Sequence, residues 1–461
     1  MLLKRKKTLS LQSVQQRLPF RFFNFGENGV GKLVADFSKN CDCTDGKLKT
    51  GLGVKLYRSF EGDNGKGVFS HYVRELFFLR NYYEASQTYA DVLYYVYEGG
   101  TSGHYDYEAK LYKVFLNHGN GCTAVRFKLS DGSERAAYSG AKGIVYYYHP
   151  YTASQPYKGV FKSIVCAHSN RLFAAKDDLT ILYSSPEDSF DYSESVDNAG
   201  EISFQNDSGA IVAIESCGGY LYVFFERGIL RLYASGKASE FKVTKIPYSG
   251  GTIVGKTVGA VGERIIFATD QGLCRLDSKS GKVERICKGL EICPAEDQDH
   301  ARHAAFNGKF LISYNDEKFG DYKTIAIDPN GSDAYLLYNR EGLSSSNGIG
   351  LCAWKQYFFT YADDGDLPDG ETYTFTAKTD FGKEDKKTLR SLLFEGTGSF
   401  HLVVESEGKR TEKAVVLSGQ TALPIGFTGK EFSLSFTLEK GTEINGFTAV
   451  VERLKGGNYA N

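Results

Sequence analysis

Short runs of alternating apolar and polar residues fill most of the chain from Phe20 onward, and Gly, Asn and Asp separate one run from the next. A period of two is the pattern of a half-buried β-strand, and those three residue types favour the turns that end it. Clear examples are VLYYVY at 92–97, IVYYY at 144–148 and YLYVFF at 220–225. Helical periodicity is nearly absent, since its best candidate, residues 70–83, is aromatic enough to form a strand. The pattern therefore predicts an all-β protein.

A degenerate repeat of about 45 residues appears between positions 162 and 362. Each copy reads strand, tight Gly or Asn turn, strand, turn, strand, and four copies can be followed, at 163–183, 210–233, 258–276 and 304–328. This length matches one blade of a β-propeller. A single such sheet cannot bury both of its faces, whereas blades stacked around an axis bury them and leave only short edges. We therefore predict a β-propeller over residues 21–365, with its clearest blades at 163–362.

The pattern of apolar and polar residues changes after the acidic stretch DDGD at 363–366. From about residue 371 to residue 454, segments of clean alternation follow one another with polar turns between them. Strands that recur every 8–12 residues or so are typical of a small β-sandwich. The sequence thus predicts a C-terminal β-sandwich over residues 366–461, with the acidic stretch as its boundary.

The N-terminal segment 1–20 is polar and basic, and no apolar segment follows its basic cluster, so it does not resemble a secretory signal. We expect a flexible N-terminal arm over residues 1–20. Two interpretations of its basic cluster stand side by side: it contacts a neighbouring protein ring or DNA, or it is a solvated tail. The residues of this candidate interface are Lys4, Arg5, Lys6 and Lys7.

Composition supports the all-β prediction and narrows the function. The 461 residues include 51 Gly, 31 Tyr and 32 Phe but only 9 Pro and 1 Trp, a balance of strand formers and turn formers. With 55 basic and 56 acidic side chains the net charge is -1, which argues against coating nucleic acid through bulk charge. No apolar run approaches the roughly 20 residues of a membrane-spanning helix, so we expect a soluble protein made in a cytoplasm. The 9 scattered Cys fit reduced core thiols better than disulfides or a metal site.

One segment matches the phosphate-binding loop of nucleotide enzymes letter for letter: GGTIVGKT at 250–257. In such a loop Lys256 would reach the phosphate oxygens and Thr257 would bind Mg²⁺. That chemistry needs a helix that begins at the lysine, but the following residues, VGAVG at 258–262, favour a strand. We therefore predict that Lys256 lies on or beside a propeller strand and binds no nucleotide. A second near match at 26–32 lacks the Ser or Thr and is interpreted as a Gly-rich turn.

Three further groups of residues suggest chemistry, and each has a simpler interpretation. The cluster EDQDHARH at 296–303 offers metal ligands, but its spacing is not that of a calcium loop and a solvated loop is favoured. The tyrosines at 146–148 and 82–83 could stack on sugars or bases, or pack as strand and interface residues. Four carboxylates could form the acid pair of a propeller glycosidase, although Asp is also a common turn residue: Asp177, Asp178, Glu187 and Asp188. We assign no catalytic, cofactor-binding or metal site.

Several segments resemble the propeller-bearing neck and tail proteins of tailed phages. LVADFSKNCDCTDGKLKTGLG at 33–53 is similar to their opening, in which an N…DG-x-L…G stretch follows an N-terminal arm. LYSSPEDSFDY at 182–192 is similar to their YSSPGDFTDW element, with Tyr192 for the usual Trp and Glu187 for Gly. GLCRL at 272–276 resembles one of their blade edges, and KEDKKTLRSL at 383–392 resembles the strand that opens their terminal sandwich. The resemblance covers most of the chain loosely.

The resemblance implies a structural virion protein of a podophage-like particle and not an enzyme. Such a protein would form a ring, expected to be a hexamer, in a head–tail connector or tail nozzle through which DNA passes during ejection without sequence-specific binding. Its partners would be its own copies and neighbouring neck or tail proteins such as an adaptor, a tail fibre or a needle, in a virion assembled in the host cytoplasm, with no cofactor and no membrane. The alternative is a carbohydrate-binding or glycan-hydrolysing β-propeller at a cell surface.

Overall fold

The computed structural model describes most of the chain, with gaps at both ends and in several connecting segments. The described ranges are 11–21, 33–43, 46–59, 73–83, 88–97, 101–106, 111–117, 123–128, 134–140, 143–148, 152–157, 162–189, 191–193, 198–205, 207–288, 290–318, 320–331, 334–338, 341–346, 349–354, 357–381 and 385–454. The predicted basic cluster Lys4–Lys7 and the Gly-rich segment 26–32 lie outside them. Throughout these ranges the regular structure is β-strand with isolated turns of 3₁₀-helix, and the predicted all-β class is confirmed. Within the same ranges no helix is long and apolar enough to cross a bilayer.

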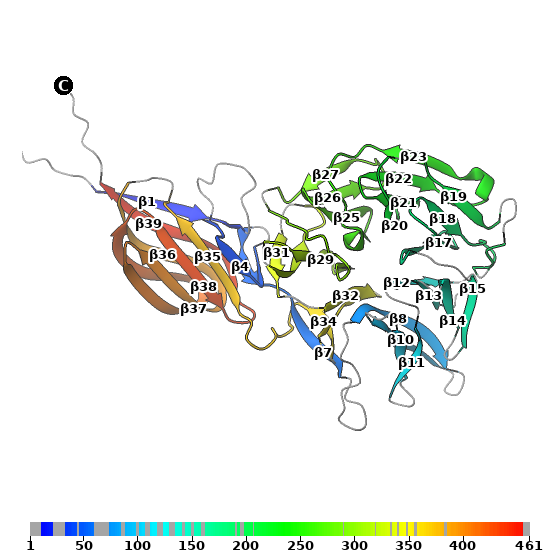
Figure 1. The fold of residues 1–461 in the computed structure, drawn as a ribbon. Helices are drawn as coiled ribbons and strands as arrows, with labels where there is room; N and C mark the ends of the chain where they lie inside the picture. The colour runs from blue at the N-terminus through cyan, green and yellow to red at the C-terminus, as the bar shows by residue number, and fades with distance from the viewer. Residues whose placement is uncertain are drawn as a thin grey trace, which may run out of the picture.

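Seven four-stranded antiparallel sheets within the described ranges surround one axis, which Figure 1 views nearly end on. Six of these blades are continuous in sequence: β8 (Val73–Tyr83), β9 (Thr88–Tyr97), β10 (Thr101–Asp106) and β11 (Leu111–Asn117); β12 (Thr123–Lys128), β13 (Glu134–Gly140), β14 (Gly143–Tyr148) and β15 (Thr152–Tyr157); β16 (Val165–His168), β17 (Arg171–Ala175), β18 (Thr180–Tyr183) and β19 (Gly200–Ser203); β20 (Ile211–Cys217), β21 (Tyr220–Phe225), β22 (Gly228–Tyr233) and β23 (Lys242–Ile246); β24 (Gly259–Val261), β25 (Arg264–Thr269), β26 (Gly272–Asp277) and β27 (Val283–Ile286); β28 (Arg302–Phe306), β29 (Lys309–Asp316), β30 (Asp321–Ile327) and β31 (Ala334–Leu337).

The predicted blade repeat is confirmed. The inner strands β16, β20, β24 and β28 begin at positions 165, 211, 259 and 302, a spacing close to the expected period. The segment at 70–83, which admitted either a helix or a strand, forms β8 from residue 73 onward. Aromatic and apolar side chains from adjoining blades interlock between the sheets, for example around the fully buried Phe173, Phe224 and Phe310.

The seventh blade joins distant parts of the chain. It consists of β32 (Glu341–Ser346), β33 (Ile349–Trp354) and β34 (Tyr357–Ala362) together with β7 (Gly53–Ser59), which pairs antiparallel with β34. Each inner strand contacts the inner strand of the next blade, and β32 contacts β8, so the ring is closed. Because β7 precedes every other propeller strand, the last blade is complete only when both ends of the propeller segment have come together.

Nine of the remaining described strands build a sheet beside the propeller (Figure 1), and β2 (Phe20–Arg21) and β3 (Leu33–Val34) form a separate parallel pair. The order of the nine-stranded sheet is β4-β35-β38-β36-β39-β6-β5, with β1 on β39 and β37 on β36. The strands are β1 (Leu11–Leu18), β4 (Phe37–Lys39), β5 (Cys41–Asp42), β6 (Leu48–Thr50), β35 (Tyr373–Thr379), β36 (Lys387–Ser406), β37 (Lys409–Gly429), β38 (Phe432–Leu438) and β39 (Glu443–Leu454). The first part of β36 pairs with β39 and its last part pairs with β38. This long strand therefore connects two parts of the sheet that face each other across a common core.

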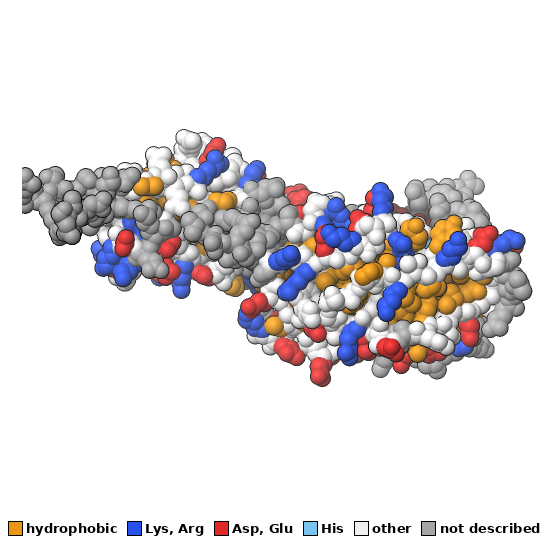
Figure 2. Space-filling view, turned by 90° about the horizontal axis from the view of Figure 1, so that it is seen from above, with side chains coloured by type: hydrophobic (Ala, Val, Ile, Leu, Met, Phe, Trp, Pro, Cys, Tyr) orange, Lys and Arg blue, Asp and Glu red, His pale blue; other side chains and the backbone are white. Residues whose placement is uncertain are grey.

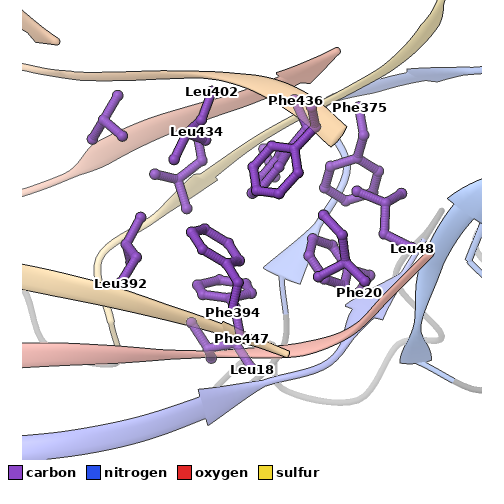
Figure 3. Packing of buried hydrophobic residues seen from close by; sticks show 14 of the residues in the cluster. Leu18, Phe20, Leu48, Phe375, Leu392, Phe394, Leu402, Leu434, Phe436 and Phe447 are labelled. Atoms are coloured by element: carbon purple, nitrogen blue, oxygen red, sulfur yellow. The ribbon is translucent and has the colours of Figure 1, made fainter. Parts of the chain in front are cut away.

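That core is built largely from phenylalanine. Figure 3 shows apolar side chains from opposite strands meeting between the two parts of the sheet. The ring of Phe20 is fully buried, and its centroid lies 5.4 Å from that of Phe375, 5.5 Å from that of Phe436 and 5.3 Å from that of Phe447. The first two pairs are nearly perpendicular, the edge-to-face geometry that aromatic quadrupoles favour.

The structure differs from the predicted division of the chain at its N-terminal end. Residues 11–18, expected in a flexible arm, form β1 and pair with β39 along all eight positions. Strands β4, β5 and β6, expected within the propeller, belong to the nine-stranded sheet. The reason is topological: the strands that complete this sheet lie on the far side of the whole propeller segment in sequence, so no local pattern could assign them.

Asn40 links the nine-stranded sheet to the propeller through hydrogen bonds. It is fully buried, in the left-handed region at φ 61°, which Asn tolerates better than most residues. Its N–H donates to Leu336 O at 2.7 Å, and its Oδ1 accepts from Tyr338 N at 2.7 Å, both at the end of β31. Its Nδ2 donates to Thr372 O at 2.9 Å, just before β35, and its carbonyl accepts from Gly51 N at 2.8 Å. One side chain thus links both modules.

Candidate functional site

The inner strands of the blades converge at the centre of the propeller (Figure 1). Residues on or next to these strands line a cavity of about 400 Å³. Residues from all seven blades line it, and its size falls within the range of small-molecule sites. Its lining contains three basic side chains, Arg126, Lys256 and Arg302, and one acidic side chain, Glu215. The site is therefore a polar, mainly cationic chamber inside an apolar scaffold.

Lys256 reaches from one blade toward blades on the other side of the cavity. It lies in a turn of 3₁₀-helix, η3 (Gly255–Thr257), directly before β24. Its Nζ donates to Thr123 Oγ1 on β12 at 2.6 Å and to the carbonyl oxygen of Ser163 at 3.2 Å. Strand β12 belongs to a blade three positions away around the ring. The ammonium group therefore lies near the propeller axis.

His303 lies next to this lysine and presents an acceptor. Its Nδ1 is 3.1 Å from the carbonyl oxygen of Lys256; since a carbonyl can only accept, Nδ1 carries the proton and Nε2 does not. The ring stacks on Phe310 with a centroid distance of 5.7 Å. A Cβ on Gly259 would lie 2.2 Å from His303 Cδ2, so glycine makes room for the ring. Burial, with Arg302 and Lys256 nearby, lowers the pKa of His303 and keeps it neutral at pH 7.

Glu215 is the one acidic residue in the described cavity lining, and protein surrounds it although one side faces the cavity. Burial raises its pKa to about 8, and hydrogen bonds from the backbone N–H groups of Ala260 and Ser216 offset this only in part. At pH 7 the carboxyl is therefore mostly protonated. The balance of charge in the cavity is positive at that pH.

We predict that Glu215 makes the protein less stable as pH rises. Below pH 4.5, its ordinary pKa, the folded and unfolded states both hold the proton; between 4.5 and about 8 only the folded state keeps it. Folding stability therefore falls through this window, by up to about 1.4 kcal/mol per pH unit from this group. Glu215→Gln should remove that part of the slope in denaturant titrations between pH 5 and 8.5. An equal gap between variant and wild type at every pH would contradict the assignment.

The phosphate-loop match at 250–257 is a structural turn. Lys256 lies beside β24, as predicted, and the 3₁₀ turn is followed by that strand instead of a helix. The hydroxyl of Thr257 is fully buried, donates to Val254 O at 2.7 Å and accepts from Ala268 N at 2.9 Å. The atom that would have to bind Mg²⁺ is thus already used to hold the turn against β25.

We expect no nucleotide binding by this segment. A ligand present at a hundredfold excess over its Kd stabilises a protein by about 2.7 kcal/mol, a shift that thermal melting detects readily. Titration with Mg-ATP and Mg-GTP should leave the melting temperature unchanged. A shift that disappears in Lys256→Ala would show the interpretation to be wrong.

The other candidate carboxylates lie in surface turns. Asp177 Oδ1 accepts from Leu179 N at 2.9 Å in the turn between β17 and β18, and Asp178 forms an ion pair with Lys162. Glu187 lies in a turn capped by the Ser185 hydroxyl at 3.2 Å. None of the four predicted carboxylates is among the described residues that line the central cavity. The structure therefore gives a glycosidase pair no support at these positions.

The cluster at 296–303 divides into a loop and a strand. Its first part turns on itself, with Asp297 Oδ1 accepting from Asp299 N at 3.1 Å, as expected for a solvated loop. Its last two residues, Arg302 and His303, begin β28 and line the cavity, which the sequence did not indicate. Across the described part of the chain, no group of three or more potential metal ligands occurs.

The tyrosines at 146–148 and 82–83 lie on β14 and β8, as expected for strand residues, and their side chains are outside the described part.

Each described cysteine is a free thiol, and all of these except Cys293 are buried. The expectation that the thiols are small core residues is confirmed for these positions.

Comparisons with known proteins show likeness of fold only. No family model and no curated protein matches the chain. Among solved structures, virginiamycin B lyase from Staphylococcus aureus is 10% identical over 67% of this chain and 99% of its own, with a TM-score of 0.46. The Pan2 WD40 domain of Neurospora crassa is 8% identical over 69% of this chain and 98% of its own, at 0.43. PorZ, a surface component of the type-IX secretion system of Porphyromonas gingivalis, is 11% identical over 75% of this chain and 45% of its own, at 0.42. Likeness at this level carries no information about function.

Proposed function

We propose that this chain is a non-enzymatic structural protein of a tailed-phage particle, the subunit of a ring in the neck or tail. The support comes from where the resembling N-terminal stretch lies. Asn40 joins the two modules, Leu48 is fully buried in the core of the nine-stranded sheet, and a Cβ on Gly51 would lie 2.7 Å from the carbonyl oxygen of Asn40. Of the described residues that carry the N…DG-x-L…G resemblance, Asn40 thus joins the propeller to the second β module, Gly51 packs against it, and Leu48 places β6 in the core of that module.

The surface of the propeller supports a role in assembly. Figure 2 shows apolar side chains gathered on one side of the propeller, at its outer strands, among lysines, arginines and acidic residues. On its outer strands Tyr233 and Val243 are 45% and 49% exposed. Apolar anchors inside a charged rim are typical of protein–protein interfaces. In this proposal the nine-stranded sheet is a sandwich-like module of the same subunit, and neighbouring proteins of the particle dock on it.

Any DNA path in this proposal lies between subunits and not within one. The central cavity of the propeller, at about 400 Å³, is of small-molecule size, and the Lys256 side chain bridges from η3 to β12 across it. A ring of subunits would enclose the wider lumen that a duplex needs, with the near-neutral net charge of -1 limiting non-specific retention of DNA.

The proposal is tested by the mass of the purified protein. We expect a closed ring, seen as a cyclic class in electron micrographs and as a mass six times 51.0 kDa by mass photometry. Measurement at low and high salt separates a specific ring from charge-driven clustering, since only the latter dissolves as screening increases. A monomer at all concentrations that never joins a phage particle would overturn the proposal.

A further inference from the structure

The central cavity has the composition of a site for a small anion. Its described lining contains three basic side chains and one acid, and Glu215 is mostly neutral at pH 7. Arg126 forms an ion pair with Glu134 at 3.8 Å, and the guanidinium of Arg302 donates to the carbonyl oxygens of Asp299 and Ala301. Lys256, whose ammonium group lies near the propeller axis, therefore supplies the positive charge for a ligand, in a chamber walled by protein. In such surroundings an ionic hydrogen bond is stronger than on an open surface.

The polar groups near Lys256 are arranged to recognise more than charge. Thr123 Oγ1 accepts from Lys256 and donates to Ser163 O at 2.7 Å, so its position is fixed from two sides. His303 holds its proton on Nδ1, which leaves Nε2 as an acceptor for a hydroxyl group. Beside the cation there are thus groups that fit the hydroxyls of a polyol.

We propose that the central cavity binds a hydroxylated organic anion of monosaccharide size, whose carboxylate or phosphate group lies on Lys256. The cavity of about 400 Å³ accommodates a ligand of that size. A magnesium nucleotide does not suit it, because the Thr257 hydroxyl is engaged in the turn and no helix begins at Lys256. This inference is independent of ring assembly, since every residue in it belongs to one subunit.

Contacts with neighbouring residues hold Lys256 in position before the anion binds. The η3 turn is held on one side by the Thr257 hydroxyl and on the other by the contact of His303 with the Lys256 carbonyl. The ammonium group is then held by Thr123 and Ser163. A cation positioned before the ligand arrives loses little entropy on binding, which favours affinity.

Calorimetric titration of the full-length protein tests the proposal at pH 7 and constant ionic strength. The ligands are glucuronate and glucose 6-phosphate, with glucose as the neutral analogue and inorganic phosphate as the anion without a polyol. We expect at least one of the two sugar anions to bind about tenfold or more tightly than glucose and than phosphate. Binding of glucuronate alone or of glucose 6-phosphate alone would identify the charged group that the site prefers.

Variants then locate the site. Lys256→Met keeps the length of the side chain without its charge, and should weaken binding of the sugar anion about tenfold or more. Lys242→Met, an exposed position on β23, is the matched control and should leave binding unchanged. The proposal is overturned if neither sugar anion binds at millimolar concentration, if glucose or phosphate binds equally well, or if Lys256→Met binds like wild type. The comparison of ligands on the wild-type protein decides the matter even if that variant fails to fold.

Discussion

Asn40→Ala is expected to lower the free energy of unfolding by about 3 kcal/mol or more. The substitution leaves the N–H of Tyr338 and the carbonyl of Thr372 without the side-chain partners that lie at 2.7 and 2.9 Å. Each buried polar group that loses its partner costs about 1–3 kcal/mol. Alanine also fits poorly at φ 61°, a region that costs a non-glycine residue about 1–2 kcal/mol.

Two probes report on the two modules separately. The protein has 1 Trp, Trp354 on β33, so its fluorescence follows the propeller, whereas circular dichroism follows all strands. In the wild type the two transitions should coincide, and in Asn40→Ala they should separate, because the junction no longer couples the modules. Asn40→Gly, which relieves the backbone, should recover only the conformational part of the loss. Gln420→Ala, at an exposed position on β37, should change nothing; coincident transitions and unchanged stability in Asn40→Ala would contradict the role of Asn40.

The propeller could be predicted from the sequence because its blades are local. In each of the first six blades, four consecutive strands form one sheet, so alternation and turn residues within about 45 positions contain the whole pattern. The seventh blade departs from this rule, since β7 at the start of the propeller segment pairs with β34 at its end. The same limit explains why β1, β4, β5 and β6 were not assigned to the C-terminal module.

The residues that line the cavity could not be predicted from the sequence for a different reason. Lys256 belongs to a motif whose chemistry it does not perform, and His303 belongs to a cluster at 296–303 for which the sequence favours a solvated loop, while Thr123 and Glu215 stand alone in ordinary strand sequences. These residues come from four different blades and meet only because the inner strands converge on one axis. The sequence contains one indication of the cavity. Glu215 is an acid within the apolar run IVAIES at 211–216, at a strand position that alternation places on the buried face.

Phe20→Ala should produce the largest loss of stability in the nine-stranded module. Phe20 is 0% exposed and touches the rings of Phe375, Phe436 and Phe447. Truncating a buried phenylalanine to alanine typically costs about 3–5 kcal/mol, the sum of lost transfer energy and the cavity left behind. Since the module is small, a loss of this size should open it well before the propeller unfolds.

The measurement is denaturant unfolding combined with hydrogen exchange of the peptides that contain β1 and β39. Phe37→Ala is the matched control, because Phe37 lies in β4 of the same sheet but is 52% exposed, and it should cost less than about 1 kcal/mol. In Phe20→Ala, exchange should accelerate in β1 and β39, whose eight paired positions depend on the docking of this segment. If Phe20→Ala instead behaved like Phe37→Ala, the N-terminal segment would be the flexible arm that its composition suggests, and β39 would be the edge of the sheet.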